Sequence, residues 1–240
     1  QHSGGPGVCL VSTGCAATNT LTGVLSAWQD GLPCIFISGQ NTLAETTRYT
    51  GKALRTFGQQ EADIVSIVAS ITKYAVMITD PASIAHELDK ALFLAMSGRP
   101  GPVWIDIPLD IQSMRVVPEE LARFVPDANL PGQPSAEDVC QVAAALRDAK
   151  RPVLLLGSGM RSAKAVDALR DFLASNPVPV TYAASAPDVI DAGDPLLIGS
   201  VGAMGCSRAG NFAVQNADLV LVVGCRLSSM VTGTDFAKFA

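Results

Sequence analysis

A row of small residues, Thr13-Gly14-Cys15-Ala16-Ala17-Thr18-Asn19, follows the first apolar run of the sequence. Small side chains at the carboxyl end of a strand let another molecule approach the backbone, which a bulky side chain would prevent. The helix that follows would offer free N–H groups to electron-rich ligand atoms. The same pattern also fits a close contact between strand and helix, with Asn19 as a helix cap. Residues 14–19 are therefore either a ligand site or a packing device.

Two cationic residues stand just before strand-like runs, Lys73 in "SITKY" and Arg99 in "SGRPGPVWIDIP". The planar guanidinium of Arg99 can hold an anionic group, or it can cap the last carbonyls of the preceding helix. Lys73 fits a solvated lysine as well as a ligand. In "LGSGMR", Gly157 and Gly159 form half of a dinucleotide fingerprint, whose third glycine is replaced by Ser162. A lone pair of this kind is more often a tight turn than a phosphate site.

The residue patterns of several common enzyme classes are absent from this sequence. It has no GxSxG, HExxH or GxxxxGK[ST] motif, and its two histidines give a catalytic triad no obvious base. Six cysteines without a CxxC pair predict no zinc site and suit a reducing cytoplasm. The net charge of −5 disfavours nucleic acid, and we expect no membrane span because no apolar run reaches about 18 residues.

The elements that would position these residues alternate along the chain. Short apolar runs of about five residues are typical of strands buried on both faces of a parallel sheet. The pattern predicts an α/β protein with two three-layer αβα domains and mostly parallel sheets, at 1–112 and 135–240, joined by a proline-rich linker at 113–134. The predicted strands are 8–12, 33–39, 75–78, 102–108, 152–157, 177–183 and 218–224, and the predicted helices are 18–29, 63–68, 81–97, 135–149, 162–175 and 207–216.

Three segments carry a family resemblance when taken together and in order. They are "GPGVCLVSTGCAATNTLTGVLSAWQDGLPCIFISGQ", "QEADIVSIVASITKY" and "SGRPGPVWIDIPLDIQ". They closely resemble the pyrimidine-binding domain of thiamine diphosphate (ThDP) enzymes of the acetolactate synthase family. The segment "GSVGAMGCSRAGNFAVQNADLVLVVGCRLSSMVTG" looks like the central, Rossmann-like domain of that family.

The resemblance implies a role for the turn. Gly14, Cys15 and Asn19 would line the pocket beside the aminopyrimidine ring of ThDP, although Cys15 stands where proline is common in the family. Gln60 matches the glutamine of the family's Gln-Glu pair, which reaches the cofactor region. The glutamate that activates the cofactor lies upstream of Gln1 by this comparison, so the resemblance implies no catalytic residue within this chain.

The resemblance also implies a role for each of the two cationic residues, Lys73 and Arg99. Lys73 matches a lysine near the substrate entrance, and Arg99 matches an arginine that contacts FAD in members that keep FAD. The turn "LGSGMR" differs from the glycine-richer turn of the FAD-binding members, which argues against FAD. The magnesium site that retains the diphosphate belongs to a domain outside this chain, and no metal ligand is expected within it.

By resemblance, the whole protein would be a cytoplasmic carboligase or decarboxylase acting on a 2-oxo acid such as pyruvate. The family's active unit contains at least two subunits, which implies a homodimer or tetramer. The 240-residue chain alone would be inactive. Two alternatives stay open: a degenerate ThDP-fold subunit with a structural or regulatory role, and an ordinary nucleotide-binding α/β protein.

Overall fold

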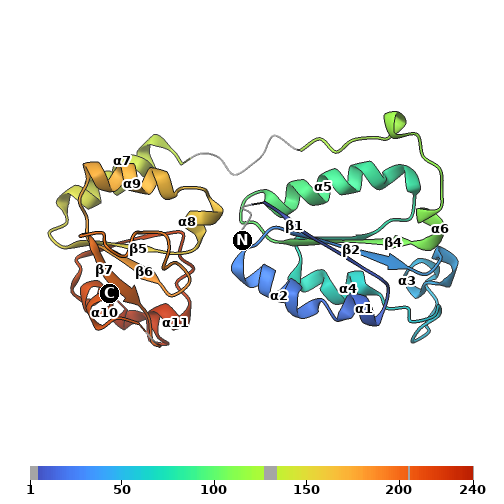
Figure 1. Ribbon diagram of the computed structural model, residues 1–240, viewed down its shortest axis with the longest axis horizontal. Helices are drawn as coiled ribbons and strands as arrows, with labels where there is room; N and C mark the ends of the chain where they lie inside the picture. Colours follow the sequence, from blue (N-terminus) through green and yellow to red (C-terminus); the bar gives the residue numbers. More distant parts are fainter. Residues whose placement is uncertain (1–4, 127–133, 205, 240) are drawn as a thin grey trace. The chain divides into compact units, whose positions relative to one another are not determined.

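The computed structural model describes residues 5–126, 134–204 and 206–239 (Figure 1). The chain forms two compact units, Gln1–Gly132 and Gln133–Ala240. The boundary between them falls within the proline-rich segment 113–134. Each unit contains a four-stranded sheet of its own.

The first unit is built on a parallel sheet with the strand order β1-β2-β4-β3. Helices cover both faces of this sheet, with α1, α2 and α4 on one side and α5 on the other (Figure 1). The predicted α/β class with parallel strands is therefore confirmed. The elements are β1 (Gly7–Val11), α1 (Cys15–Thr18), α2 (Leu21–Asp30), β2 (Cys34–Gln40), α3 (Thr47–Thr50), α4 (Ile64–Val68), β3 (Tyr74–Met77), α5 (Ile84–Met96), β4 (Pro102–Pro108) and α6 (Leu109–Gln112), with short 3-10 turns at Leu43–Glu45, Ala69–Ile71, Pro81–Ser83 and Pro118–Glu120.

The strands of this unit bury alternate residues on opposite faces. On the side of α2 and α4, the rings of Phe36 and Trp104 stack with centroids 5.3 Å apart, and Ile64 belongs to the same cluster. On the side of α5, Val103 and Ile105 are fully buried. Because both faces of the central strands β2 and β4 are covered, these strands read in the sequence as nearly continuous apolar runs, whereas Val8 and Leu10 of the edge strand β1 are exposed.

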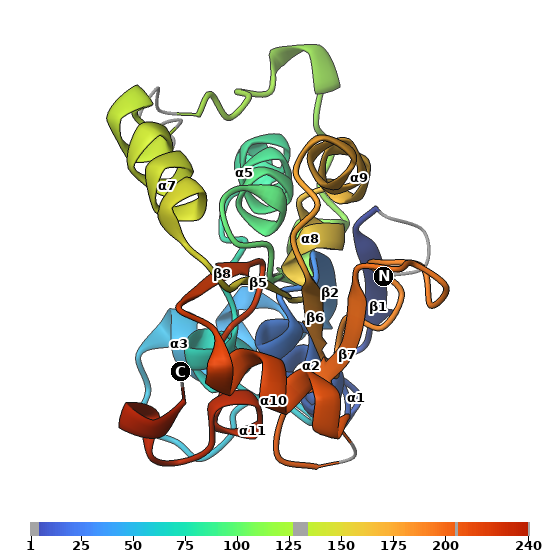
Figure 2. The same cartoon turned by 90° about the vertical axis from the view of Figure 1, so that its left-hand side faces the viewer.

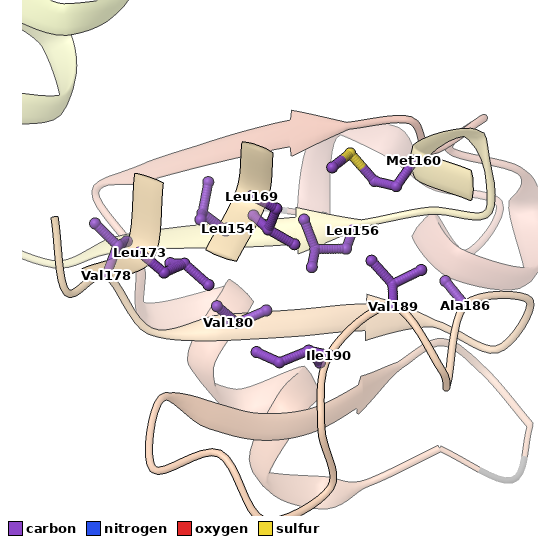
Figure 3. Close-up of a cluster of buried hydrophobic side chains, with 10 residues drawn as sticks. All are labelled: Leu154, Leu156, Met160, Leu169, Leu173, Val178, Val180, Ala186, Val189 and Ile190. Atoms are coloured by element: carbon purple, nitrogen blue, oxygen red, sulfur yellow. The ribbon is translucent and has the colours of Figure 1, made fainter. Parts of the chain in front are cut away.

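The second unit is also built on a parallel sheet with helices on both faces, and its strand order is β7-β6-β5-β8. The helices α7 and α9 lie over one face, and α10 and α11 lie over the other (Figure 2). Leucine and valine side chains of β5, α9 and β6 converge in one core cluster (Figure 3). The elements are α7 (Ala136–Asp148), β5 (Pro152–Leu156), α8 (Gly159–Ser162), α9 (Val166–Ser175), β6 (Val180–Ala183), β7 (Leu197–Val201), α10 (Arg208–Asn216), β8 (Leu219–Val223) and α11 (Ser229–Thr232), with a 3-10 turn at Phe236–Lys238.

Local signals explain where the helices begin and break. Ser135 and Asp138 form a reciprocal capping box at the start of α7, which confirms the helix predicted at 135–149. The helix predicted at 18–29 is confirmed as α2, which begins three residues later because the N–H of Thr20 bonds to the carbonyl of Ala17 in a tighter turn that separates the short α1 from α2. The helix predicted at 162–175 is likewise confirmed as α9, which begins four residues later, and the short helix α8 before it was not predicted. The prediction also missed β7, whose sequence contains Gly199.

Candidate functional site

The turn after β1 lies in direct contact with a second segment of the first unit. Gly14 has a left-handed backbone, with φ of +62°, at the start of α1. A Cβ atom built on Gly14 would lie 1.9 Å from the carbonyl oxygen of Gln60. Only glycine fits this contact without movement of the neighbouring backbone. The structure therefore brings together Gly14 and Gln60, two residues that the sequence analysis selected from separate motifs.

The polar side chains of the turn and of Gln60 face solvent. Cys15, Asn19 and Gln60 are all exposed. Among the described residues, the side-chain amides of Asn19 and Gln60 have no hydrogen-bond partner, so the side chain of Asn19 does not cap a helix. Gln60 itself has a left-handed backbone, with φ of +56°, which is uncommon for a residue other than glycine. Both amides are free to bind a ligand.

The next residue, Glu61, explains how Gln60 is held. Its buried carboxylate accepts hydrogen bonds from the backbone N–H and hydroxyl of Thr47, at 2.5 and 2.6 Å, and from the N–H of Phe57 at 2.5 Å. Burial acts to raise the pKa of Glu61, but these hydrogen bonds outweigh it and lower the pKa. Glu61 thus anchors the segment from which Gln60 projects.

A buried polar network lies beneath the turn, and its two central residues, Gln40 and Asp106, were not predicted from the sequence. Gln40 ends β2, and its side chain bonds to Thr13 of the turn and to Asp106 of β4. Asp106 is 1% exposed, and burial raises its pKa to about 6 although hydrogen bonds from Ser38 and Gln40 lower it. The available signal was a polar residue within each of the apolar runs "CIFISGQ" and "PVWIDIP".

The two predicted cations, Lys73 and Arg99, lie at the amino ends of the strands, opposite the carboxyl end of β1 where the turn begins. Lys73 precedes β3 and Arg99 precedes β4, so both stand at the amino ends of parallel strands. The ammonium of Lys73 donates to the carbonyl of Ser97 at 2.6 Å, at the end of α5, and burial lowers its pKa. Arg99 donates to the carbonyl of Gln29 at 2.9 Å. Arg99 thus caps the end of α2 and not, as one expectation had it, the helix that precedes it.

The glycine pair in "LGSGMR" also has a packing role. A Cβ atom on Gly157 would lie 2.2 Å from the carbonyl oxygen of Gly224, and one on Gly159 would lie 2.7 Å from it. The loop after β8 therefore occupies the space that these glycines leave free, which supports the tight-turn interpretation. Two grooves of the second unit, of about 730 and 550 Å³, contain none of the predicted site residues in their linings.

The part of the chain that the structure describes shows neither a metal-binding cluster nor a membrane-spanning helix. Within it, no group of three or more His, Cys, Asp and Glu side chains could hold a metal ion. No helix there has the length and apolar character needed to cross a membrane.

Comparison with protein families matches both units. The family described as "Thiamine pyrophosphate enzyme, N-terminal TPP binding domain" matches residues 1–67, which include the turn and Gln60. The family described as "Thiamine pyrophosphate enzyme, central domain" matches residues 139–240. Together with the two parallel α/β units, these matches define the class. The chain belongs to the thiamine pyrophosphate enzyme family.

Within this family the chain is similar to acetolactate synthases. It is 37% identical to the acetolactate synthase large subunit of Parasynechococcus marenigrum, over 97% of this chain and 37% of that protein. It is 35% identical to the acetolactate synthase isozyme 2 large subunit of Escherichia coli, over 97% of this chain and 40% of that protein. With the chloroplastic acetolactate synthase of Arabidopsis thaliana the identity is 33%, over 97% and 34%. The chain thus spans less than half the length of these relatives.

Proposed function

We propose that the whole protein is a ThDP-dependent enzyme of the acetolactate synthase type. It would remove carbon dioxide from a 2-oxo acid such as pyruvate and join the remaining two-carbon unit to a second carbonyl compound. The observation that carries the proposal is the contact of Gly14 with Gln60, inside the segment that matches the TPP binding domain. The likeness to acetolactate synthases over 97% of the chain supports the choice within the family.

The residues of the first unit suit the aminopyrimidine end of ThDP. Gly14, without a side chain, lets the turn lie directly against the segment that carries Gln60. Asn19 and Gln60 offer side-chain amides, each of which can both donate and accept hydrogen bonds. When bound, the cofactor supplies the carbanion chemistry, and the protein supplies binding and orientation. We assign Gly14, Cys15, Asn19 and Gln60 to this binding role.

Other parts of the proposal concern groups that this chain does not hold by itself. Magnesium would bind the diphosphate through hard oxygen ligands outside the described residues. A second copy of the chain would complete a homodimer or tetramer, and the cytoplasm is the proposed compartment. We propose that FAD is not used, because the backbone of Gly224 fills the space beside Gly157 and Gly159.

Two measurements on the full-length protein test the proposed function. ThDP with magnesium should raise the melting temperature, whereas NAD should not, because only a ligand that binds the folded state stabilises it. Incubation with pyruvate should then release carbon dioxide and form acetolactate. Stabilisation by NAD alone would favour an ordinary nucleotide-binding protein. ThDP binding without turnover of any 2-oxo acid would favour a degenerate subunit with a structural or regulatory role.

A further inference from the structure

One side-chain amide connects the two segments of the candidate site. The side-chain oxygen (Oε1) of Gln40 accepts a hydrogen bond from the hydroxyl of Thr13 at 2.7 Å. The amide nitrogen of Gln40 donates to the carbonyl oxygen of Ala62 at 3.0 Å. Thr13 opens the turn, and Ala62 lies two residues after Gln60. Gln40 is 7% exposed, so this bridge lies beneath the surface that the site residues present.

A neighbouring side chain reinforces the same connection. The backbone N–H of Asn41 donates to the side-chain oxygen (Oε1) of Gln40 at 3.0 Å. The side-chain amide of Asn41 donates to the carbonyl oxygen of Gln59 at 3.1 Å. The end of β2 is therefore bonded to the turn on one side and to residues 59–62 on the other.

The buried carboxylate of Asp106 fixes which way the amide of Gln40 points. An ionised carboxylate only accepts hydrogen bonds. It therefore requires the nitrogen end of the Gln40 amide, which lies 3.1 Å away, and leaves the oxygen end for Thr13. If the amide were reversed, its oxygen would face a carboxylate oxygen and its nitrogen would face the N–H of Asn41.

Hydrogen bonds between buried side chains fix the position of the Asp106 carboxylate. The hydroxyl of Ser38 donates to the other oxygen of Asp106 at 2.5 Å, and the indole N–H of Trp104 donates to Ser38 at 2.8 Å. All three of these residues are no more than 1% exposed. The pairing of β2 with β4 places Ser38 directly opposite Asp106. Among the described residues Asp106 has no ion-pair partner; the charged groups that act on it are Asp63 and Arg48, which pair with each other.

We propose that Gln40 is a positioning residue for the cofactor site. Its amide, oriented by Asp106, fixes the position of the turn that begins at Thr13 relative to the segment that carries Gln60. This inference rests on the proposed function, because it assigns the purpose of the network to ThDP binding. It adds three residues, Thr13, Gln40 and Asp106, that do not themselves face the ligand.

A matched set of variants of the full-length protein tests this role. Gln40→Met keeps the length of the side chain and removes its hydrogen bonds. Thr13→Val removes only the hydroxyl, and Thr13→Ser restores it. The control is Gln112→Met, because the amide of Gln112 also donates to a backbone carbonyl, that of Ile107 at 2.6 Å, but is not bonded to the turn.

The first readout needs no cofactor. The amides of Thr18 and Asn19 bond to carbonyls of Gly14 and Cys15, at 2.9 and 3.0 Å, and their hydrogen exchange reports opening of the turn. Both Gln40→Met and Thr13→Val lose the hydrogen bond between Thr13 and Gln40, and this loss should speed the exchange of these amides about fivefold. A peptide containing Ser97, whose N–H bonds to Phe93 at the other edge of the sheet, gives the internal reference.

The second readout is the dissociation constant of ThDP in the presence of magnesium. Gln40→Met and Thr13→Val should bind ThDP about tenfold more weakly, whereas Thr13→Ser and Gln112→Met should stay within about twofold of the unchanged protein. Rescue by serine separates the hydroxyl's hydrogen bond from mere packing at this position. If Gln40→Met fails to fold, the valine and serine variants of the half-buried Thr13 decide the question.

The outcomes are distinct. Failure of the unchanged protein to bind ThDP would refute the proposed function, and the positioning role would fall with it. Normal binding by the unchanged protein, Gln40→Met and Thr13→Val alike would overturn the positioning role alone. Faster exchange with unchanged affinity would also overturn it, because the clamp would then have no consequence for the cofactor.

Discussion

Gly14 and Gln60, 46 positions apart in the sequence, touch through their backbones, with only 1.9 Å between a Cβ atom built on Gly14 and the carbonyl oxygen of Gln60. Gly14 is also in the left-handed conformation that side chains disfavour. The shape of the turn and the position of Gln60 therefore depend on each other. A methyl group at this one position would separate them.

Gly14→Ala should therefore damage both the fold and the site. We expect the free energy of unfolding to fall by roughly 1–3 kcal/mol and ThDP binding to be lost, because the methyl group must displace Gln60. Gly23→Ala is the matched control. Gly23 lies within α2, and a Cβ atom built on it would meet nothing within 4 Å. The control substitution should stabilise the protein by roughly 0.5–1 kcal/mol. Urea unfolding and ThDP titration measure both effects, and equal behaviour of the two variants would contradict the contact.

The sequence was informative where a signal is local. Apolar runs indicated β1, β2, β4, β5 and β8, and the helix predicted at 135–149 matches α7 within one residue at each end. The small residues of the turn were recognisable as a place of close approach, although the partner was not. Contact with Gln60 depends on how the loop after β2 folds back, which no local pattern specifies.

The polar network was missed for a related reason. Asp106 lies opposite Ser38 only because β4 pairs directly with β2, and the strand between them in the sequence, β3, lies at the edge. Strand order is a property of the whole sheet. In the sequence, one aspartate inside an apolar run does not reveal its hydrogen-bond partner. Strand β7 was missed because Gly199 interrupts its apolar pattern.

Asn19 and Gln60 should affect the cofactor more than the fold. Both are exposed, and neither side-chain amide has a partner among the described residues, so Asn19→Ala should change the free energy of unfolding by less than about 0.5 kcal/mol. Its affinity for ThDP should fall by roughly 1–3 kcal/mol. Gln60→Gly makes a sharper test, because it removes the amide and relieves the left-handed backbone. It should lose affinity without losing stability; unchanged affinity in both variants would return the turn to a packing role.

Asp106→Asn should change how stability depends on pH. Burial raises the folded-state pKa of Asp106 to about 6 from an ordinary value of 3.8, so the folded protein binds more protons than the unfolded chain between these values. Stability from this group is therefore lost as pH rises from about 4 to about 6, by up to about 3 kcal/mol. The asparagine variant has no such titration.

The comparison is made by urea unfolding of both proteins at several values between pH 4 and pH 7. The free energy of unfolding of Asp106→Asn, relative to that of the unchanged protein, should increase across this range. Hydrogen bonds lost in the variant contribute equally at every pH, so only the slope of the difference is diagnostic. A difference that stays constant from pH 4 to pH 7 would show that Asp106 is ionised throughout.

Lys73 and Arg99 give the last prediction, because their contacts suggest a different role from the one that the family resemblance implies. Each donates to a carbonyl near the end of a helix, where a positive charge is favourable. Lys73→Met should therefore lower the free energy of unfolding by roughly 1 kcal/mol, and the exposed Arg99→Met by less. ThDP affinity should not change, since both residues lie at the edge of the sheet opposite the turn. A raised KM for the 2-oxo acid in Lys73→Met with unchanged stability would instead establish a place at the substrate entrance, and both effects together would mean that one side chain serves both roles.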